Sequence, residues 1–214
     1  TDNLPKTMVM FHDKPFLEYL VEMVREQGFT KILMLLGYLP DKIMDHFGNG
    51  ENWGVSIQYS VSSVDDETGR RLRIARPSLD PTFLLMYCDN YWPMPFDSMW
   101  QQYGQSRTQA QVTVYRNADQ YSRSNLLVDK NSRVLTYDPS RSAPGLSGVD
   151  IGFLILESPV VDLMPDENLS FEHTVYPQLV AEGQLGAYVT DHRYYSVGSH
   201  ERLPETDKFL DRRP

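Results

Sequence analysis

Apolar positions in the first part of the chain alternate between helical and extended spacing. Residues 16–27 carry apolar side chains at every third or fourth position, which predicts a helix. Residues 31–36 form a nearly continuous apolar run before Gly37, which predicts a strand buried on both faces. A short helix is expected over residues 40–47. Strict alternation over residues 55–61 predicts a strand with one face in the core.

The alternation of helices and strands continues to residue 115. The pattern predicts a basic helix over residues 67–76, an apolar strand over 82–87, a helix over 94–103 and a strand over 112–115. Consecutive strands separated by helices normally form a parallel sheet with helices on both faces.

The second half has a different pattern. Residues 125–129 and 133–137 flank Lys130-Asn131-Ser132 and predict an antiparallel hairpin. Next come a strand over 149–156, a helix capped by Ser170 and running to about residue 182, a strand over 185–189, and a final helix from Ser199 to about Arg212. We therefore predict an α/β fold: a three-layer, Rossmann-like, mostly parallel mixed sheet with an antiparallel excursion in the second half.

Composition narrows the range of partners. The formal net charge is −9, from 20 basic and 29 acidic residues, which argues against nucleic acid as the main partner but not against one anionic small molecule. Cys88 is the single cysteine, which rules out an intramolecular disulfide and favours a reducing, cytoplasmic setting. We interpret Cys88 as a small buried residue at a strand end. No apolar stretch approaches the ~20 residues of a membrane span, and no signal-peptide pattern opens the chain.

Two residues stand where chemistry is expected. In open α/β sheets, ligands bind beyond the carboxyl ends of strands, and Asp89 directly follows an apolar strand. Its carboxylate is either a ligand for a divalent cation that bridges phosphates or a turn-forming, helix-capping group. Lys6 is either a phosphate partner or a solvated side chain. The run from Arg70 to Arg76 is interpreted as a solvated helix face.

Together, these segments resemble the sugar-1-phosphate nucleotidyltransferases over nearly the whole chain. The motif Leu4-Pro5-Lys6-Thr7-Met8 is similar to the family's "PKxM/L" segment, and the strand ending in Asp89 is similar to the strand carrying its acid. The order of the similar segments is specific, although each one is weak alone: residues 1–8, 14–17, 32–38, 82–89, 148–153, 171–179 and 194–203.

The resemblance implies a GT-A-like fold and a reaction in which an NTP and a sugar 1-phosphate give an NDP-sugar and pyrophosphate. The sugar phosphate oxygen would attack the α-phosphorus in line, with Mg²⁺ as the cofactor. The implied catalytic residues are Lys6 and Asp89, with Asp89 on the metal and Ser196 as a second metal candidate. Lys6, Gly37, Thr68 and Gly69 would bind the nucleotide, and Asp150, Gly152 and Glu172 would bind the sugar.

Within the family, the chain resembles the mannose- and heptose-1-phosphate guanylyltransferases, so GTP and a mannose- or heptose-type sugar 1-phosphate are favoured. Residues 1–210 are expected to form the nucleotidyltransferase domain. Residues 211–214 would be a tail or the start of a linker to a phosphatase domain of the haloacid dehalogenase type. We also expect a cytoplasmic protein that can form homo-oligomers.

Three departures from the family pattern bear on activity. The family's first strand and Gly-rich loop would lie upstream of Thr1. Ser196 stands in place of a second metal-binding Asp, and Pro139 stands near the place of a lysine that meets the sugar phosphate, for which Lys130 or Arg141 could substitute. The chain is therefore interpreted as part of an enzyme or, alternatively, as a catalytically impaired homologue that binds nucleotide sugars or acts as a regulatory subunit. An unrelated α/β binding domain is a third alternative.

Overall fold

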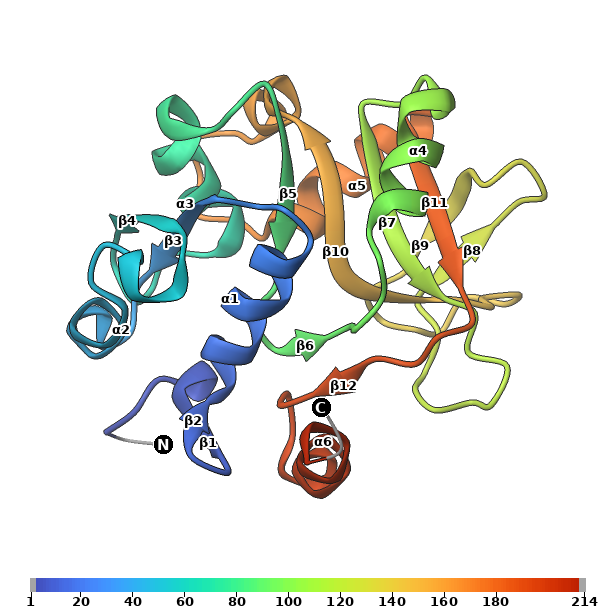
Figure 1. The fold of residues 1–214 in the computed structure, drawn as a ribbon. Helices are drawn as coiled ribbons and strands as arrows, with labels where there is room; N and C mark the ends of the chain where they lie inside the picture. Colours follow the sequence, from blue (N-terminus) through green and yellow to red (C-terminus); the bar gives the residue numbers. More distant parts are fainter. Residues whose placement is uncertain (1–2, 212–214) are drawn as a thin grey trace. The chain divides into compact units, whose positions relative to one another are not determined.

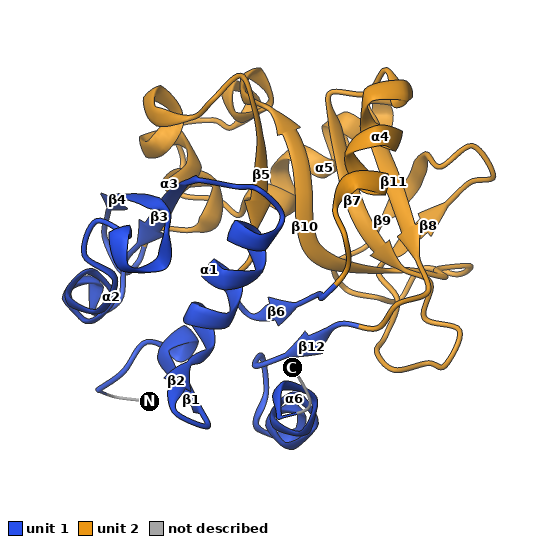
Figure 2. Cartoon of the chain, viewed as in Figure 1, with its two compact units in different colours: residues 1–65, 88–93, 194–214 blue, residues 66–87, 94–193 orange. Residues whose placement is uncertain are grey.

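The computed structural model describes residues 3–211, and the chain divides into two compact units (Figures 1 and 2). Unit 1 comprises Thr1–Asp65, Cys88–Pro93 and Tyr194–Pro214. Unit 2 comprises Asp66–Tyr87 and Met94–Arg193. Of the expected tail over residues 211–214, residues 212–214 lie outside the described residues, as does the helix end predicted near Arg212.

Unit 2 is built on a four-stranded sheet in the order β11-β7-β10-β5. Strand β11 is parallel to β7, whereas β10 is antiparallel to both β7 and β5. Three strands therefore share one direction and β10 is the reversed one, which confirms the predicted mostly parallel mixed sheet. The strands are β5 (Thr82–Met86), β7 (Ala110–Tyr115), β10 (Val149–Glu157) and β11 (Leu185–Thr190).

Helix α4 (Asp97–Ser106) covers one face of this sheet. Every residue of β7 is buried, including the polar residues Gln111 and Thr113. Gln111 donates to the Met99 carbonyl (2.9 Å) and Thr113 contacts the Met99 sulfur (3.1 Å). These partners on α4 satisfy polar groups that would otherwise be costly to bury.

Helix α5 (Phe171–Ala181) covers the opposite face. Asp150 of β10 lies directly across from Val114, which alternates with Thr113 along β7 and so points away from α4. The buried Tyr176 of α5 donates to Asp150 on that side. Helices thus lie on both faces of the sheet, as the alternation predicted.

The predicted hairpin forms from β8 (Leu126–Val128) and β9 (Val134–Tyr137). Helix α3 (Thr68–Ala75) packs on α5 and on the 3-10 helix η4 (Ser158–Leu163). The basic residues of α3 do not form a purely solvated face. Arg73 pairs with Asp166 (2.5 Å), and Arg76, just beyond the helix, pairs with Asp162 (3.0 Å).

In unit 1, β3 (Lys31–Leu36) and β4 (Ser56–Val61) form a parallel pair joined through α2 (Pro40–Phe47). The prediction that β3 is buried on both faces is wrong, because only Met34 and Leu36 are buried. Within residues 3–211, β3 pairs with β4 alone, so it is an edge strand of a two-stranded sheet and not a central strand.

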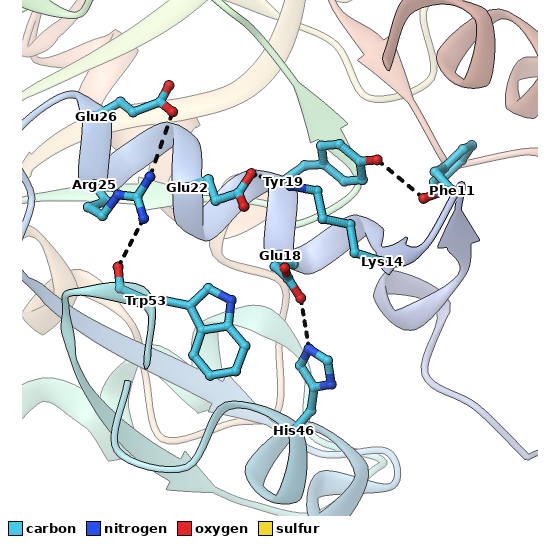
Figure 3. A network of polar contacts seen from close by, with 9 residues as sticks. All are labelled: Phe11, Lys14, Glu18, Tyr19, Glu22, Arg25, Glu26, His46 and Trp53. Atoms are coloured by element: carbon cyan, nitrogen blue, oxygen red, sulfur yellow. Dashed lines mark hydrogen bonds and ion pairs between the residues drawn. The ribbon is translucent and has the colours of Figure 1, made fainter. Parts of the chain in front are cut away.

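Helix α1 (Phe16–Glu26) buries its apolar side and uses its polar side to bind the segments around it (Figure 3). His46 of α2 meets Glu18 (3.0 Å), and Arg25 donates to the Trp53 carbonyl (3.3 Å) in the 3-10 helix η2 (Glu51–Trp53). On the same helix, Glu22 accepts from Lys14 (2.6 Å) of β2 (Lys14–Pro15), and Tyr19 donates to Phe11 (3.2 Å) of β1 (Met10–Phe11).

The rest of unit 1 comes from distant parts of the sequence. Strand β6 (Asn90–Tyr91) pairs antiparallel with β12 (Tyr195–Ser196), which leads through η5 (His200–Arg202) to α6 (Leu203–Leu210). The Phe209 ring of α6 stacks on Tyr195 at 3.7 Å. Cys88, expected to be buried, is exposed, because β5 ends at Met86 and the chain turns before β6. No helix among the described residues is long and apolar enough to cross a membrane.

Candidate nucleotide and sugar sites

Unit 1 brings together the two predicted catalytic residues, Lys6 and Asp89. Lys6 opens the 3-10 helix η1 (Lys6–Met8) and donates from Nζ to the carbonyl of Gly198 (2.9 Å). A Cβ atom built on Gly198 would lie 3.5 Å from Asp89 Oδ2 and 3.9 Å from Lys6 Nζ. The carboxylate and the ammonium group therefore both point to the space beside this exposed glycine.

The β6–β12 pair fixes Asp89 beside the chain that leads to Gly198. The Asp89 carbonyl accepts from the backbone N–H of Val197 (2.8 Å) and from the Ser196 hydroxyl (3.2 Å). Ser196 is buried, and its Oγ also accepts from the Gly198 N–H (3.0 Å). Ser196 thus holds the backbone around Asp89, and its hydroxyl is already engaged in two hydrogen bonds.

The side chains of unit 1 that could bind a metal suit an ion that enters together with a substrate better than an ion that is bound permanently. Nowhere in residues 3–211 do three or more His, Cys, Asp or Glu side chains gather as a metal cage. Mg²⁺ is commonly held by one or two carboxylates, with phosphate oxygens and water completing its six ligands. Asp89 offers one such carboxylate, next to an ammonium group that suits phosphate.

The remaining predicted nucleotide-binding residues belong to two different units. Gly37 directly follows β3 in unit 1. Thr68 and Gly69 belong to unit 2, where Gly69 is buried: a Cβ atom there would lie 2.6 Å from the Leu169 carbonyl. Thr68 accepts from the backbone N–H of Phe171 (2.9 Å), so both residues join α3 to the start of α5.

Thr68 also meets a residue predicted for the sugar. Its hydroxyl donates to Glu172 Oε2 (3.2 Å), which accepts a second hydrogen bond from Ser170 (2.8 Å). Ser170 caps α5 as predicted, accepting from the His173 N–H (3.5 Å). Glu172 in the first turn is also favoured by the helix dipole. The carboxylate of Glu172 is therefore held in a fixed orientation before any ligand binds.

Asp150, at the start of β10, is held on both carboxylate oxygens. Oδ1 accepts from the Gly152 N–H (2.8 Å) and Oδ2 from the Tyr176 hydroxyl (3.0 Å). The Asp150 N–H donates to the buried Asn125 side chain (2.9 Å). Burial raises the pKa of Asp150 to about 6, although its two hydrogen bonds oppose the shift; the negative charge of Glu172 adds to it.

Gly152 is where β10 changes register. Its pairing with β7 shifts between Asp150 and Leu154, and Gly152 has a φ of +77°. A Cβ atom at this position would lie 3.1 Å from the Cβ of Tyr87, whose N–H donates to the Gly152 carbonyl (2.9 Å). Only glycine combines the left-handed backbone of this bulge with such close packing.

Tyrosine rings complete the polar cluster of Asp150 and Glu172. The Tyr87 hydroxyl is shielded from solvent, and its pKa is raised well above the usual value by burial and by the charge of Glu172. Tyr137 packs edge-on against Tyr176 with 4.9 Å between ring centroids, and burial also raises the pKa of Tyr137. We define these five residues as the carboxylate–tyrosine cluster: Tyr87, Tyr137, Asp150, Glu172 and Tyr176.

Sequence reasoning singled out the carboxylates of this cluster and missed the tyrosines. Tyr176 lies within the segment 171–179 that is similar to a family motif, and Tyr87 ends the predicted strand over residues 82–87. Asn125 and Gly198 were missed as well. The signal available in the sequence was weak, because a tyrosine on an apolar helix or strand is normally a core residue.

The chain matches the nucleotidyl transferase family over residues 1–212 and belongs to that family. This confirms the predicted enzyme class, the sugar-1-phosphate nucleotidyltransferases. A probable glucose-1-phosphate cytidylyltransferase of Bacillus subtilis (strain 168) is 24% identical over 97% of this chain and 89% of its own length. The D-glycero-alpha-D-manno-heptose 1-phosphate guanylyltransferase of Aneurinibacillus thermoaerophilus is 20% identical over 97% and 90%.

Solved structures confirm the fold. HddC from Yersinia pseudotuberculosis, complexed with GMP-PN, superposes with a TM-score of 0.81 at 20% identity, covering 97% of this chain and 90% of that one. Several other curated relatives are longer proteins, of which the chain spans between 52% and 56%.

Proposed function

We propose that this chain forms an NDP-sugar and pyrophosphate from an NTP and a sugar 1-phosphate, by in-line attack of the sugar phosphate oxygen on the α-phosphorus. The observation that carries this proposal is the convergence of Lys6 and Asp89 on the space beside Gly198. Catalysis of phosphoryl and nucleotidyl transfer depends mainly on positioning and charge neutralisation. A fixed ammonium group beside a fixed carboxylate supplies both functions.

In this mechanism, Lys6 neutralises charge that builds up on the phosphates as pyrophosphate leaves. Its contact with the Gly198 carbonyl limits the motion of its long side chain, so less entropy is lost on binding. Asp89 would hold a Mg²⁺ ion that enters with the nucleotide, and this ion supplies charge neutralisation at the phosphate oxygens. Ser196 keeps the backbone of Asp89 in place.

The carboxylate–tyrosine cluster is proposed to bind the sugar. Carboxylate oxygens each accept more than one hydrogen bond, and those of Asp150 and Glu172 have capacity left for sugar hydroxyls. Gly152 would act on the sugar through Asp150, because its N–H donates to Asp150 Oδ1 (2.8 Å) while Tyr87 fills the space that a side chain at Gly152 would need. Gly37, Thr68 and Gly69 stay predictions as nucleotide-binding residues, and Thr68 would act through Glu172 as well.

GTP and a mannose- or heptose-type sugar 1-phosphate are the substrates we favour. The heptose 1-phosphate guanylyltransferase relative and the structural neighbour with bound GMP-PN support this choice. Residues 1–210 as one nucleotidyltransferase domain, a following phosphatase domain, homo-oligomers and a cytoplasmic location also remain predictions.

One observation favours a second candidate function. Ser196 stands where a second carboxylate was expected, and a hydroxyl is a far poorer ligand for a hard cation. A chain that binds a nucleotide sugar without transferring the nucleotide, as a binding or regulatory subunit, is the alternative.

A substrate panel separates the two functions. Purified protein is incubated with each of four NTPs and with mannose, glucose or heptose 1-phosphate, and pyrophosphate release is followed with and without Mg²⁺. We expect Mg²⁺-dependent release, fastest with GTP. Binding of NDP-sugars by calorimetry without any pyrophosphate release would instead favour the binding-subunit alternative.

A further inference from the structure

Tyr87 lies at the carboxyl edge of the unit 2 sheet, directly after β5. Its backbone N–H donates to the Gly152 carbonyl (2.9 Å), which continues the pairing of β5 with β10 one step beyond Met86 and Phe153. The start of β10, with Asp150, lies at the same edge, because β10 runs antiparallel to the other strands. Tyr87 and Asp150 are therefore at the same end of the sheet.

The register of β5 and β10 places the Tyr87 side chain on the face covered by α5. Phe153 packs against Phe96, immediately before α4, with 6.0 Å between ring centroids, so Phe153 faces α4. Its partner across the strands, Met86, faces the same side. Tyr87 is the next residue along the chain and therefore points to the opposite side. The Asp150 carboxylate lies on that side too, because it accepts a hydrogen bond from α5.

The Tyr87 ring packs against the bulge in β10. The position that a Cβ atom would take at Gly152 is 3.2 Å from Tyr87 Cδ2 and 3.6 Å from Tyr87 Cγ. The N–H of the same glycine donates to Asp150 Oδ1 (2.8 Å). Contacts with one glycine therefore place the tyrosine ring beside the carboxylate of Asp150.

The Tyr87 hydroxyl is buried and has no hydrogen-bond partner among residues 3–211. Leaving a buried hydroxyl unpaired is unfavourable, and native structures seldom do so. Burial, together with the charges of Glu172 and Asp150, raises the pKa of Tyr87 well above its usual value, so the phenol keeps its proton at neutral pH. Tyr87 therefore carries a hydrogen-bond donor that the fold itself does not use.

The two carboxylates of the carboxylate–tyrosine cluster create a need for such a donor. The groups that contact Asp150 and Glu172 give their hydrogens to the carboxylate oxygens. An ionised carboxylate only accepts hydrogen bonds, so a sugar hydroxyl that binds to it must donate its hydrogen. The oxygen of that sugar hydroxyl then needs a donor of its own, and Tyr87 offers one on the same face of the sheet.

We propose that Tyr87 determines sugar specificity: its hydroxyl donates to one sugar hydroxyl, which in turn donates to a carboxylate of the carboxylate–tyrosine cluster. The Tyr87 ring is partly exposed, so a shift of this side chain, and not of the sheet, brings the hydroxyl to the sugar. A site that hydrogen-bonds a substrate hydroxyl rejects analogues that lack it, because a buried protein group is then left unpaired. The inference rests on the proposed function, because it concerns the sugar bound by the same cluster.

The test compares sugar phosphates that differ by one hydroxyl. Titration calorimetry measures binding of mannose 1-phosphate, glucose 1-phosphate and the monodeoxy analogues of each to the wild type, Tyr87→Phe and Tyr103→Phe. We expect Tyr87→Phe to bind the sugar 1-phosphate that the wild type prefers about ten- to hundredfold more weakly, because a buried hydrogen bond is lost. The deoxy analogue that lacks the hydroxyl contacted by Tyr87 should bind equally to both proteins.

Tyr103→Phe is the matched control, since it removes a hydroxyl from α4, on the opposite face of the sheet, and should leave all affinities unchanged. Thermal melts give an independent measurement. Tyr87→Phe should melt at or above the wild-type temperature, because an unpaired buried hydroxyl is removed. Tyr176→Phe should melt below it, because Asp150 loses a donor.

The inference alone is overturned if folded Tyr87→Phe and the wild type bind the preferred sugar phosphate equally, or if Tyr87→Phe weakens every deoxy analogue by the same factor. A Tyr87→Phe protein that melts below the wild type also overturns it, because the hydroxyl would then have a partner in the free chain. Failure of the wild type to bind any sugar phosphate overturns the proposed function together with the inference.

Discussion

The polar cluster of unit 1 and the carboxylate–tyrosine cluster of unit 2 are organised in opposite ways. In unit 1, the contacts that hold Lys6 and Asp89 involve backbone atoms: the Gly198 carbonyl, the Asp89 carbonyl and the Val197 N–H. In unit 2, side chains hold side chains, as in the hydrogen bonds from Tyr176 to Asp150 and from Thr68 to Glu172. The difference indicates that unit 2 presents a more specific set of partners, whereas unit 1 presents mainly charge.

The largest expected effect follows from removing the negative charge of Asp89 in unit 1. Asp89→Asn should lower Mg²⁺-dependent pyrophosphate release by at least about 100-fold, because the neutral amide cannot balance a divalent cation. Steady-state assays with saturating NTP and sugar 1-phosphate measure the change. Asp13→Asn, which removes an exposed carboxylate from the same unit, should leave the rate unchanged. Normal turnover in Asp89→Asn would remove this residue from the site.

The next prediction separates the ligands of the two clusters. Glu172→Ala should weaken sugar 1-phosphate binding by about 1–3 kcal/mol while NTP affinity changes much less, because Thr68 and Ser170 lose their acceptor and the sugar loses a partner. Competition binding with each ligand measures both values. Glu182→Ala, at the other end of α5, is the control. Equal losses for the two ligands would contradict a role on the sugar side.

A glycine pair tests how tightly unit 2 is packed around its site. Gly152→Ala should lower the free energy of unfolding by about 1–3 kcal/mol, because the alanine must adopt a positive φ and its methyl group meets Tyr87 at 3.1 Å. Gly145→Ala is the matched control, since its φ is +80° but no atom lies within 4 Å of the added Cβ. Urea titrations of both variants give the values. If Gly152→Ala lowers the free energy of unfolding no more than Gly145→Ala does, Tyr87 moves aside at little energetic cost.

The smallest expected effect is the pH dependence of stability that the ionisation of Asp150 causes. The pKa of Asp150 is about 6 in the folded chain and near 3.9 when unfolded, so the fold binds this proton more tightly. Ionisation of Asp150 therefore lowers the free energy of unfolding as the pH rises from about 4 to 6, and the full loss is present above pH 6. Asp150→Asn should gain on the order of 1 kcal/mol over wild type between pH 4.5 and pH 7 in urea titrations. A difference that does not change with pH would show that Asp150 stays ionised throughout.

Local patterns were enough to predict most elements. The apolar run predicted the bounds of β3, and the helical repeat predicted those of α1 to within one residue, because both depend on side-chain periodicity alone. Helix α4 begins at Asp97, three residues later than predicted, because Pro95 disfavours helical backbone at Met94. The burial of β3 could not be predicted, because it depends on which strands pair with it.

The candidate sites show the same limit. The strand end at Asp89 and the family motifs were sufficient to select the carboxylates. They were not sufficient to pair Asp150 with Tyr176, because that contact requires the bulge in β10 and the docking of α5, both set by long-range packing.

The bulge at Gly152 divides β10 into two segments with different surroundings. Beyond it, residues 153–156 are fully buried and residues 154–156 pair with both neighbouring strands, so a substitution there is a substitution in the core. Ahead of it, Asp150 accepts a hydrogen bond from Tyr176, and β10 pairs with β7 in a different register from the one it has after the bulge. Substitutions at Asp150 that leave its buried neighbours Val149 and Ile151 unchanged could therefore retune sugar preference without altering the core of β10.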